Sequence, residues 1–562
     1  MKNDKRIKRI LIHLGLVILA SLLFALSFPN PVIKNGVSFL AWFALLPILI
    51  VINKNNILIC AGWGAVYGLT AYALFNYWLG AFHPLAGTIT YTLYLIYMLI
   101  VFVFLKLAIM FFPKHGYLVQ WLIWLAYEYL RTTGFLGYSY GIIGYSQWRM
   151  IPLIQIAGIT GVWGVSALVT FPSFWLAKFI SAEGFNTQEL ASRDHFRARL
   201  LISNFSLSKL KNKIPLIIWL GFLIFTLVFG LIGMKDFSSY PKANIALVQH
   251  NTDPWEPSRA PSSYLIAELY RRDLSNLIKL SDEALAREPK PQMVVWSETA
   301  FVPRIYWHTT YRDDQISWLI VKELLEYLSK QDVPFLIGND DARRDSAKNP
   351  NAAEKHRVDY NAAMLFEKGI NTATYRKHHL VPFTEHFPYQ KQFPRFYKWL
   401  KEADTHFWEK GTEKTVFSLP EFTFCAPICF EDTFGYISRD FVKRGADILI
   451  NLSNDAWSNS VTAQYQHLTM AVFRAVENNR SMVRSTTSGE TCAIDPNGRI
   501  IAHAPPYRET GINVSVPVIK DISIYTKYGD YLAIFFVFMA AIMLLFGALW
   551  CTMRKLRSRG TQ

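Results

Sequence analysis

The chain has 562 residues, of which 52% are hydrophobic and 15% aromatic, and its formal net charge is +16. It is too long for one ordinary domain and too apolar for an ordinary soluble protein. Its five cysteines are few and unevenly spread, which argues against a disulfide-stapled secreted scaffold. We therefore expect part of the chain to lie in a membrane.

Eight apolar stretches approach the length that crosses a bilayer, for which a helix needs about 20 residues. They are residues 10–28, 38–53, 57–79, 87–112, 117–131, 153–181, 214–234 and 528–553. The second and fifth are short, and the fifth carries Glu128 and Arg131. The first has a basic start like a signal peptide, but its apolar run is long for one and the cleavage motif Ala25-Leu26-Ser27 is weak. We expect about eight membrane helices.

Lysine and arginine in short loops predict the orientation, because these residues favour the cytoplasmic side. The short outer loops hold only Lys34, Arg131 and Arg149. The inner segments hold Lys2, Lys5, Arg6, Lys8, Arg9, Lys54, Lys114, Arg193, Arg197, Arg199, Lys209, Lys211, Lys213, Arg554, Lys555, Arg557 and Arg559. This asymmetry places both termini in the cytoplasm and the region after residue 240 outside. It also accounts for most of the net charge without a nucleic-acid partner.

Between residues 237 and 525 strand-like runs alternate with amphipathic helical patterns, which predicts one α/β domain. A hairpin over 491–504 turns at Pro496-Asn497-Gly498, and the polar stretch 340–359 is expected to be an exposed loop. Helices are expected at 262–288, 315–331 and 463–479. Strands are expected within 243–251, 292–300, 333–340, 360–369, 372–383, 422–430 and 446–455.

Three reactive side chains follow predicted strands, where α/β sheets gather functional groups. Glu298 follows the run MVVW, Lys377 follows TATYR and Cys429 follows FCAPI. Cysteine attacks as a thiolate, so a glutamate that takes its proton and a lysine that stabilises the oxyanion suit covalent acyl transfer. Each residue alone has an ordinary explanation, as a solvated charge or a small core residue.

Cys425 lies four residues before Cys429, and Pro427 interrupts a regular strand between them. We therefore expect Cys425 to be a core residue and not a resolving thiol or metal ligand. The nearby histidines form no metal-ligand spacing, so no metal is expected. These histidines are His378, His379 and His386.

Four ordered motifs carry a family resemblance. They are WSETA (296–300), YRKHHLVPFTEHFP (375–388), CFED (429–432) and NLSNDAWS (451–458), and they resemble the carbon-nitrogen hydrolase, or nitrilase, superfamily. Such a domain before the last span is similar to the apolipoprotein N-acyltransferases of bacterial envelopes, over essentially the whole chain. VQHNTDPWE and QHLTMAVFRAVENNRSMVRSTTSGET are further similar stretches.

The resemblance implies three domains and a set of site residues. A membrane domain at 1–236 with about seven helices precedes an α-β-β-α sandwich at 237–525, and a membrane helix with a basic cytoplasmic tail follows at 526–562. Cys429 is implied as nucleophile, Glu298 as proton acceptor and Lys377 as oxyanion stabiliser. The supporting positions implied are Glu385, Glu431, Trp255 and Phe430, the last in place of a tyrosine often found after the family cysteine.

The reaction implied is ping-pong transfer without a cofactor, the last step of lipoprotein maturation. Cys429 would take an acyl chain from a glycerophospholipid and pass it to the N-terminal amine of a diacylglyceryl-cysteine lipoprotein. The protein would be a monomer in the bacterial cytoplasmic (inner) membrane, with its catalytic domain on the periplasmic side. The aromatic segments 301–311 and 393–411 are expected either to enter the membrane interface or to pack the domain.

Two other functional classes remain open. A membrane-anchored amidase or nitrilase would hydrolyse small C–N bonds and would stay active on soluble substrates without its spans. A receptor or transporter with an extracellular sensor would need intramembrane charges along a path. The spans offer few such charges beyond Glu128 and Lys106.

Overall fold

The computed structural model describes residues 2–82, 84–182, 213–312, 314–344, 357–402 and 407–559. The chain divides into two compact units, one of residues 1–233 and 530–562 and the other of residues 234–529. The basic residues predicted for the inner segment between 193 and 211 lie outside the described residues.

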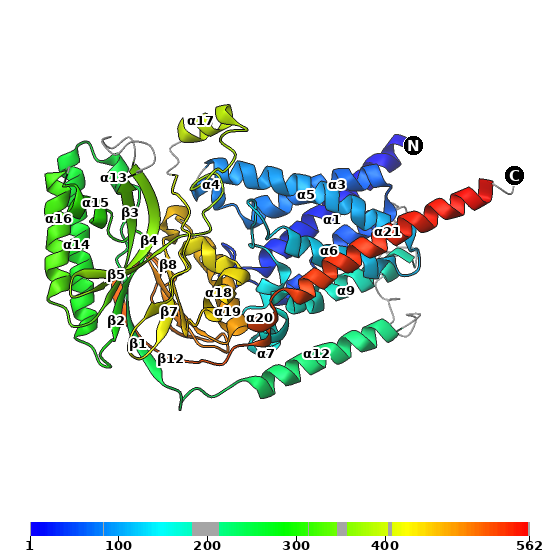
Figure 1. Cartoon of the computed structure of the whole chain (residues 1–562). Helices are drawn as coiled ribbons and strands as arrows, with labels where there is room; N and C mark the ends of the chain where they lie inside the picture. The colour runs from blue at the N-terminus through cyan, green and yellow to red at the C-terminus, as the bar shows by residue number, and fades with distance from the viewer. Residues whose placement is uncertain are drawn as a thin grey trace. The chain divides into compact units, whose positions relative to one another are not determined.

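The first unit is built from helices (Figure 1). The helices Ile57–Phe75 and Pro84–Phe111 approach each other closely, where Gly64 and Gly68 face the backbone of Met98 and Tyr94. A Cβ atom on Gly64 would lie 2.4 Å from the Met98 oxygen, so only glycine allows this approach. The elements are α1 (Lys2–Ser27), η1 (Ser38–Trp42), α2 (Leu46–Lys54), α3 (Ile57–Phe75), α4 (Leu79–Phe82), α5 (Pro84–Phe111), α6 (Gly116–Leu130), η2 (Ile143–Gln147), α7 (Ile151–Ile154), α8 (Ala157–Thr160), α9 (Val162–Ala182), α12 (Ile214–Gly233) and α21 (Tyr531–Arg559).

Six helices among the described residues are long and apolar enough to cross a membrane, so the predicted total of about eight is not confirmed. The predicted span 38–53 is divided between η1 and the 9-residue α2, and the one at 117–131 is the 15-residue α6. The span predicted at 153–181 is broken by Gly161, whose φ of 65° is left-handed. The six are Lys5–Ser27, Ile57–Phe75, Leu85–Phe111, Val162–Ser181, Ile214–Gly233 and Tyr531–Arg554.

The second unit alternates strands and helices along the chain (Figure 1). In order, it contains β1 (Lys242–Gln249), α13 (Glu256–Arg259), α14 (Ser263–Leu285), β2 (Met293–Trp296), α15 (Ile305–Thr310), α16 (Gln315–Ser329), β3 (Phe335–Arg344), β4 (Arg357–Glu367), β5 (Ile370–Arg376), α17 (Pro394–Glu402), β6 (Phe417–Ser418), β7 (Thr423–Cys425), η5 (Cys429–Thr433), α18 (Gly435–Lys443), β8 (Ile448–Ser453), η6 (Asp455–Ser458), α19 (Val461–Asn478), β9 (Ser481–Thr486), β10 (Cys492–Ile494), β11 (Ile500–His503), β12 (Thr510–Pro517) and α20 (Ile524–Tyr528).

These strands form two six-stranded sheets in the orders β12-β1-β2-β3-β4-β5 and β11-β10-β9-β8-β7-β6. The sheets face each other, because the Ser485 hydroxyl of β9 contacts the Val248 oxygen of β1 at 3.3 Å and the Val295 oxygen of β2 at 3.1 Å. Helices α14 and α16 cover the outer face of the first sheet, and α18 and α19 cover that of the second (Figure 1). This confirms the predicted α-β-β-α sandwich.

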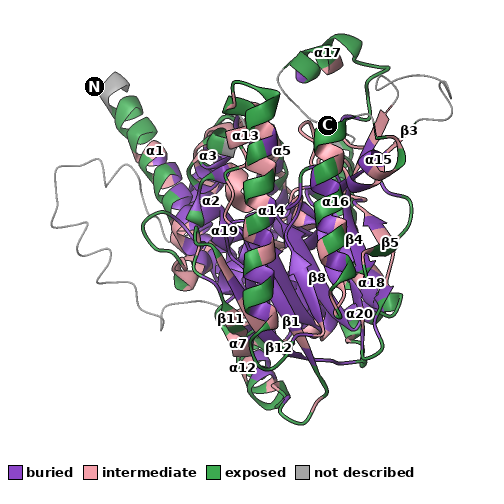
Figure 2. Ribbon diagram, turned by 90° about the vertical axis from the view of Figure 1, so that its left-hand side faces the viewer, coloured by how far each residue is buried: buried purple, intermediate pink, exposed green. Residues whose placement is uncertain are grey.

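Burial follows from this layering (Figure 2). Every residue of β8 and β9 is buried, because both faces of these strands are covered. Helix α14 buries a stripe that includes Leu274 and Leu277 and exposes its opposite side, as an amphipathic helix on a sheet does.

Several predicted elements have different bounds or surroundings in the structure. The ends of the polar stretch 340–359 belong to β3 and β4 and not to a loop, while residues 345–356 lie outside the described part of the chain. The segment 301–311 packs into the domain, because Ile305 and Trp307 of α15 are buried. In the segment 393–411, by contrast, α17 buries only Leu400 and exposes Trp399, and Phe393 just before α17 is exposed as well.

Candidate active site

Cys429 begins η5 directly after the second sheet, with a left-handed φ of 49°. This conformation costs energy for a residue with a side chain and is typical of functional sites. The amide of Asn451, on the neighbouring β8, fixes the turn by donating to the Pro427 oxygen at 3.1 Å and the Cys429 oxygen at 3.2 Å. The sheet therefore sets the direction of the Cys429 side chain.

Glu298 follows β2, and both of its carboxylate oxygens are held. Oε1 accepts a hydrogen bond from the Asn361 amide at 2.8 Å and lies 3.4 Å from Lys377 Nζ. Oε2 accepts from the backbone N–H of Asn454 at 2.9 Å. Residues from both sheets thus orient this carboxylate.

Lys377 follows β5 and is completely buried between two carboxylates. Its Nζ lies 2.9 Å from Glu385 Oε1 as well as 3.4 Å from Glu298 Oε1. Burial alone would lower the pKa of Lys377, but the charges of Glu385 and Glu298 outweigh burial and raise it. Lys377 is therefore held as an ammonium ion. Glu385 in turn accepts from the Val381 N–H at 2.9 Å, and burial raises its own pKa.

The Cys429 thiol responds to the same charges. Burial and the negative charge of Glu298 raise the pKa of Cys429 well above its ordinary value, and Lys377 acts in the opposite direction. The resting thiol is consequently protonated. An attack by its sulfur requires a nearby proton acceptor, and Glu298 is the carboxylate whose charge acts most strongly on the thiol.

Glu431 is fully buried and connects the two sides of the site. Its carboxylate accepts from one hydroxyl and three backbone N–H groups, which surround Lys377 on one side and Cys429 on the other. The donors are the Tyr375 hydroxyl at 2.9 Å and the N–H groups of His378 at 2.8 Å, His379 at 2.9 Å and Ile428 at 2.8 Å. Burial raises the pKa of Glu431.

The two remaining predicted residues are aromatic. Trp255 is 39% exposed and packs edge-on against Trp457 of η6, with ring centroids 4.7 Å apart. Phe430 is buried and packs edge-on against Phe434 at 4.9 Å. Trp255 thus contacts the turn that presents Asn454 to Glu298, and Phe430 packs beside the nucleophile candidate.

Cys425 is buried at the end of β7, which confirms its prediction as a core residue. Sequence reasoning missed four residues that orient the site. Asn451 and Asn454 lie within the NLSNDAWS motif and Tyr375 opens the YRKHHLVPFTEHFP motif, so these motifs held a signal for them, whereas Asn361 lies in an ordinary strand. The four are Asn361, Tyr375, Asn451 and Asn454.

Comparison with known proteins agrees with this fold. Residues 244–520 match the family model described as "Carbon-nitrogen hydrolase", and residues 20–175 match "Apolipoprotein N-acyltransferase N-terminal domain". The chain therefore combines a carbon-nitrogen hydrolase domain with several apolar helices, and it is a multi-pass membrane enzyme.

Three curated relatives show which kind of membrane enzyme this is. Apolipoprotein N-acyltransferase 1 of Treponema denticola is 43% identical over 93% of this chain and 94% of its own length. Apolipoprotein N-acyltransferase 1 of Treponema pallidum is 42% identical over 95% of each chain. Apolipoprotein N-acyltransferase of Borreliella burgdorferi is 30% identical over 91% of each chain. The chain belongs to the apolipoprotein N-acyltransferase family, and it is an acyltransferase.

Proposed function

We propose that this acyltransferase moves an acyl chain from a glycerophospholipid, through a Cys429 thioester, to the N-terminal amine of a diacylglyceryl-cysteine lipoprotein. The observation that carries the proposal is the buried Lys377 ammonium, held between Glu298 and Glu385, whose charge acts on the Cys429 thiol. Family membership supports the choice of acceptor, since the relatives are named for that activity.

In the first half-reaction, Glu298 takes the thiol proton while the Cys429 sulfur attacks an ester carbonyl of the phospholipid. The oxyanion of the tetrahedral intermediate is stabilised by Lys377, which serves as a cation because its neighbours keep it protonated. The ester C–O bond then breaks. The leaving alkoxide takes the proton from Glu298, and lysophospholipid departs.

In the second half-reaction, the lipoprotein amine attacks the thioester carbonyl and Glu298 takes one of its protons. The C–S bond breaks, the amide forms, and the Cys429 sulfur recovers the proton. The two half-reactions balance without a cofactor, and one chain supplies every group named, which supports a monomer.

The location follows from chain connectivity and charge. The helices α12 and α21 enter and leave the second unit, so their adjoining ends lie on one side of the membrane. The distribution of lysine and arginine makes that side the periplasmic one. We therefore place the catalytic domain in the periplasm, with both termini in the cytoplasm, where phospholipid and lipoprotein substrates share the outer leaflet.

Intact mass spectrometry of the detergent-purified protein tests this proposal. Wild type is incubated with a phospholipid and then with a diacylated lipopeptide that has a free N-terminus, with Cys429→Ala as the matched control. We expect wild type alone to gain one acyl mass and to lose it as the lipopeptide becomes triacylated. An acyl adduct lost only to water would favour the amidase alternative, and no adduct would refute the Cys429 thioester.

A further inference from the structure

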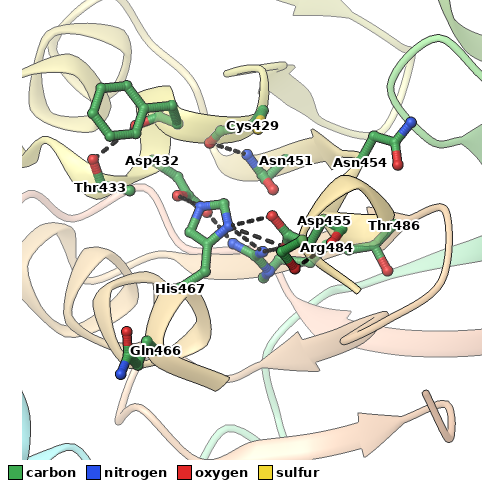
Figure 3. A network of polar contacts seen from close by, with 12 residues as sticks. Cys429, Asp432, Thr433, Asn451, Asn454, Asp455, Gln466, His467, Arg484 and Thr486 are labelled. Carbon is green, nitrogen blue, oxygen red and sulfur yellow. Dashed lines mark hydrogen bonds and ion pairs between the residues drawn. The ribbon is translucent and has the colours of Figure 1, made fainter. Parts of the chain in front are cut away.

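Four charged side chains from separate elements meet beside the Cys429 turn, three of them buried and the fourth, Asp455, 13% exposed (Figure 3). His467 of α19 lies between Asp432 of η5 and Asp455 of η6, and Arg484 of β9 completes the group. His467 Nε2 is 2.6 Å from Asp432 Oδ1, and Nδ1 is 3.0 Å from Asp455 Oδ1. We call these four residues the ion cluster. They lie in the motifs of the family resemblance, but none has a role in the reaction proposed above.

The geometry favours a doubly protonated His467. Carboxylate oxygens only accept hydrogen bonds, so a ring with a carboxylate at each nitrogen donates from both. Arg484 Nη2 is also 3.3 Å from His467 Nδ1, but the contact of Nδ1 with Asp455 is shorter. Two anions then face two cations, and the buried cluster is electrically balanced.

Electrostatics agree with the geometry. Burial alone would lower the pKa of His467, but the charges of Asp432 and Asp455 outweigh burial and the opposing charge of Arg484, and the pKa rises to about 9. Burial alone would raise the pKa of Asp455, but His467 and Arg484 hold it below its ordinary value.

The ion cluster connects the turn that carries Cys429 with the turn that holds Glu298. Asp432 is three residues after Cys429 in the same short helix, η5. Asp455 directly follows Asn454, whose N–H holds Glu298 Oε2. The imidazolium therefore bridges the turn of the nucleophile and the turn that holds the proton acceptor.

We infer that His467 is a positioning residue for acyl transfer, whose imidazolium fixes the Cys429 turn at the distance from Glu298 that proton transfer requires. It acts through Asp432 and Asp455 and touches no reacting atom. The inference rests on the proposed function, because it assigns Cys429 and Glu298 the roles given there. The left-handed turn at Cys429 needs such support, since strained conformations persist only where their surroundings fix them.

The test compares His467→Gln with His503→Gln in the full-length protein. His503 is a suitable control because it lies in the same unit and its side chain is 60% exposed. Two rates are measured: acylation of Cys429 by phospholipid, and alkylation of Cys429 by iodoacetamide as a function of pH. We expect H467Q to slow acylation roughly ten- to hundredfold, since small displacements of reacting groups have effects of that order. We also expect a shifted pH midpoint of alkylation and little change in the KM for phospholipid, with H503Q like wild type.

A purely structural role would lower the unfolding temperature of H467Q but leave the acylation rate and the alkylation profile unchanged, and this result would overturn the inference. Failure of the proposed function is distinguishable, because it would abolish acylation in wild type and H503Q alike. Alkylation by iodoacetamide needs no acyl donor, so it can be measured even then. Its pH midpoint would still report on the position of Glu298 relative to the Cys429 thiol.

Asp432→Asn provides a second variant if H467Q does not fold. It keeps the side-chain volume while removing one carboxylate partner of His467, so it should also slow acylation. The double variant H467Q/D432N should be no slower than the slower single variant, because both changes disrupt one bridge. Additive losses would contradict the bridge.

The charge of His467 has its own readout. Because its pKa is raised in the folded protein, the stabilisation is full below the ordinary histidine pKa of about 6.5 and is lost as pH rises through about 9. The unfolding temperature of wild type should therefore fall toward that of H467Q as pH rises from 7 to 10. A constant difference over this range would contradict an imidazolium at this position.

Discussion

The carboxylate of Glu431 supports the site by accepting hydrogen bonds from its neighbours. It receives three backbone N–H groups and the Tyr375 hydroxyl in a fully buried position. An ionised carboxylate has no donor, so both oxygens suit this set of donors. The chain segments that present Lys377 and Cys429 are thereby fixed to one side chain.

Replacing Glu431 with glutamine should therefore affect both stability and catalysis. The new NH₂ group faces N–H donors and leaves buried groups unpaired, at a cost of about 1–3 kcal/mol in the free energy of unfolding. We expect a lower unfolding temperature and slower acylation of Cys429, measured by tryptophan fluorescence and intact mass. Glu421→Gln is the control, because Glu421 is exposed in the same domain. Equal unfolding temperatures for the two variants would contradict this account.

At the same scale, the motifs showed which side chains to expect but not what holds them. Glu298 and Lys377 were predicted to act together, and they form an ion pair. Asn361 could not be predicted, because an asparagine within a strand looks like any polar residue until its pairing partners are known. The contact of His467 with Asp432 joins residues 35 positions apart, and no local pattern encodes it.

At the scale of elements, the strands that lead to the site end earlier than predicted. Strand β5 stops at Arg376 and β7 at Cys425, two residues before Pro427. Proline cannot donate to the sheet, so Cys429 leaves the strand ladder and begins η5. Hydrophobic alternation continues past both ends, which is why the sequence predicted longer strands at 372–383 and 422–430.

Three strands were not predicted at all: the two-residue β6, and the longer β9 and β12. Strand β9 carries the charged Arg484, which is buried only because Asp432 and Asp455 pair with it. Strand β12 lies antiparallel beside β1, far away in the sequence, and closes the first sheet. Such partners are set by tertiary packing, which a local pattern does not record.

One glycine shows how a strand positions Glu298, the proposed proton acceptor. Gly338 of β3 lies against the turn that carries Glu298, and a Cβ atom there would be 2.2 Å from the Ser297 oxygen. Gly338→Ala must displace this turn, and we expect acylation to slow by about a hundredfold if the displacement is about 1 Å. Gly511→Ala is the control, because its Cβ would be 3.1 Å from the nearest atom, the Leu280 oxygen. Similar rates of Cys429 acylation in the two variants would contradict a positioning role for Gly338.

For the whole molecule, the structure confirms the membrane spans predicted from composition, whereas their predicted number of about eight is not confirmed. Hydropathy counts apolar residues and does not record where a helix breaks, so η1, α2 and α6 were counted as spans. Helix α6 buries Glu128 and Gln120, so its polar side chains are shielded by the other helices of its unit. Short buried helices of this kind are hard to tell from spans by apolar content alone.

The proposed orientation makes opposite predictions for two exposed positions. Glu421 lies in the catalytic unit and should face the periplasm, whereas Lys114, between α5 and α6, should face the cytoplasm. Each is changed to cysteine in a background with Cys429→Ala and Cys551→Ser, which leaves only the buried Cys60, Cys425 and Cys492. A membrane-impermeant maleimide added to spheroplasts should label E421C at once and K114C only after permeabilisation, because a charged reagent does not cross the bilayer core. The parent background without either new cysteine controls for labelling of the buried thiols. The reverse pattern would place the catalytic domain in the cytoplasm, away from lipoproteins in the outer leaflet, and would contradict both the orientation and the proposed acceptor.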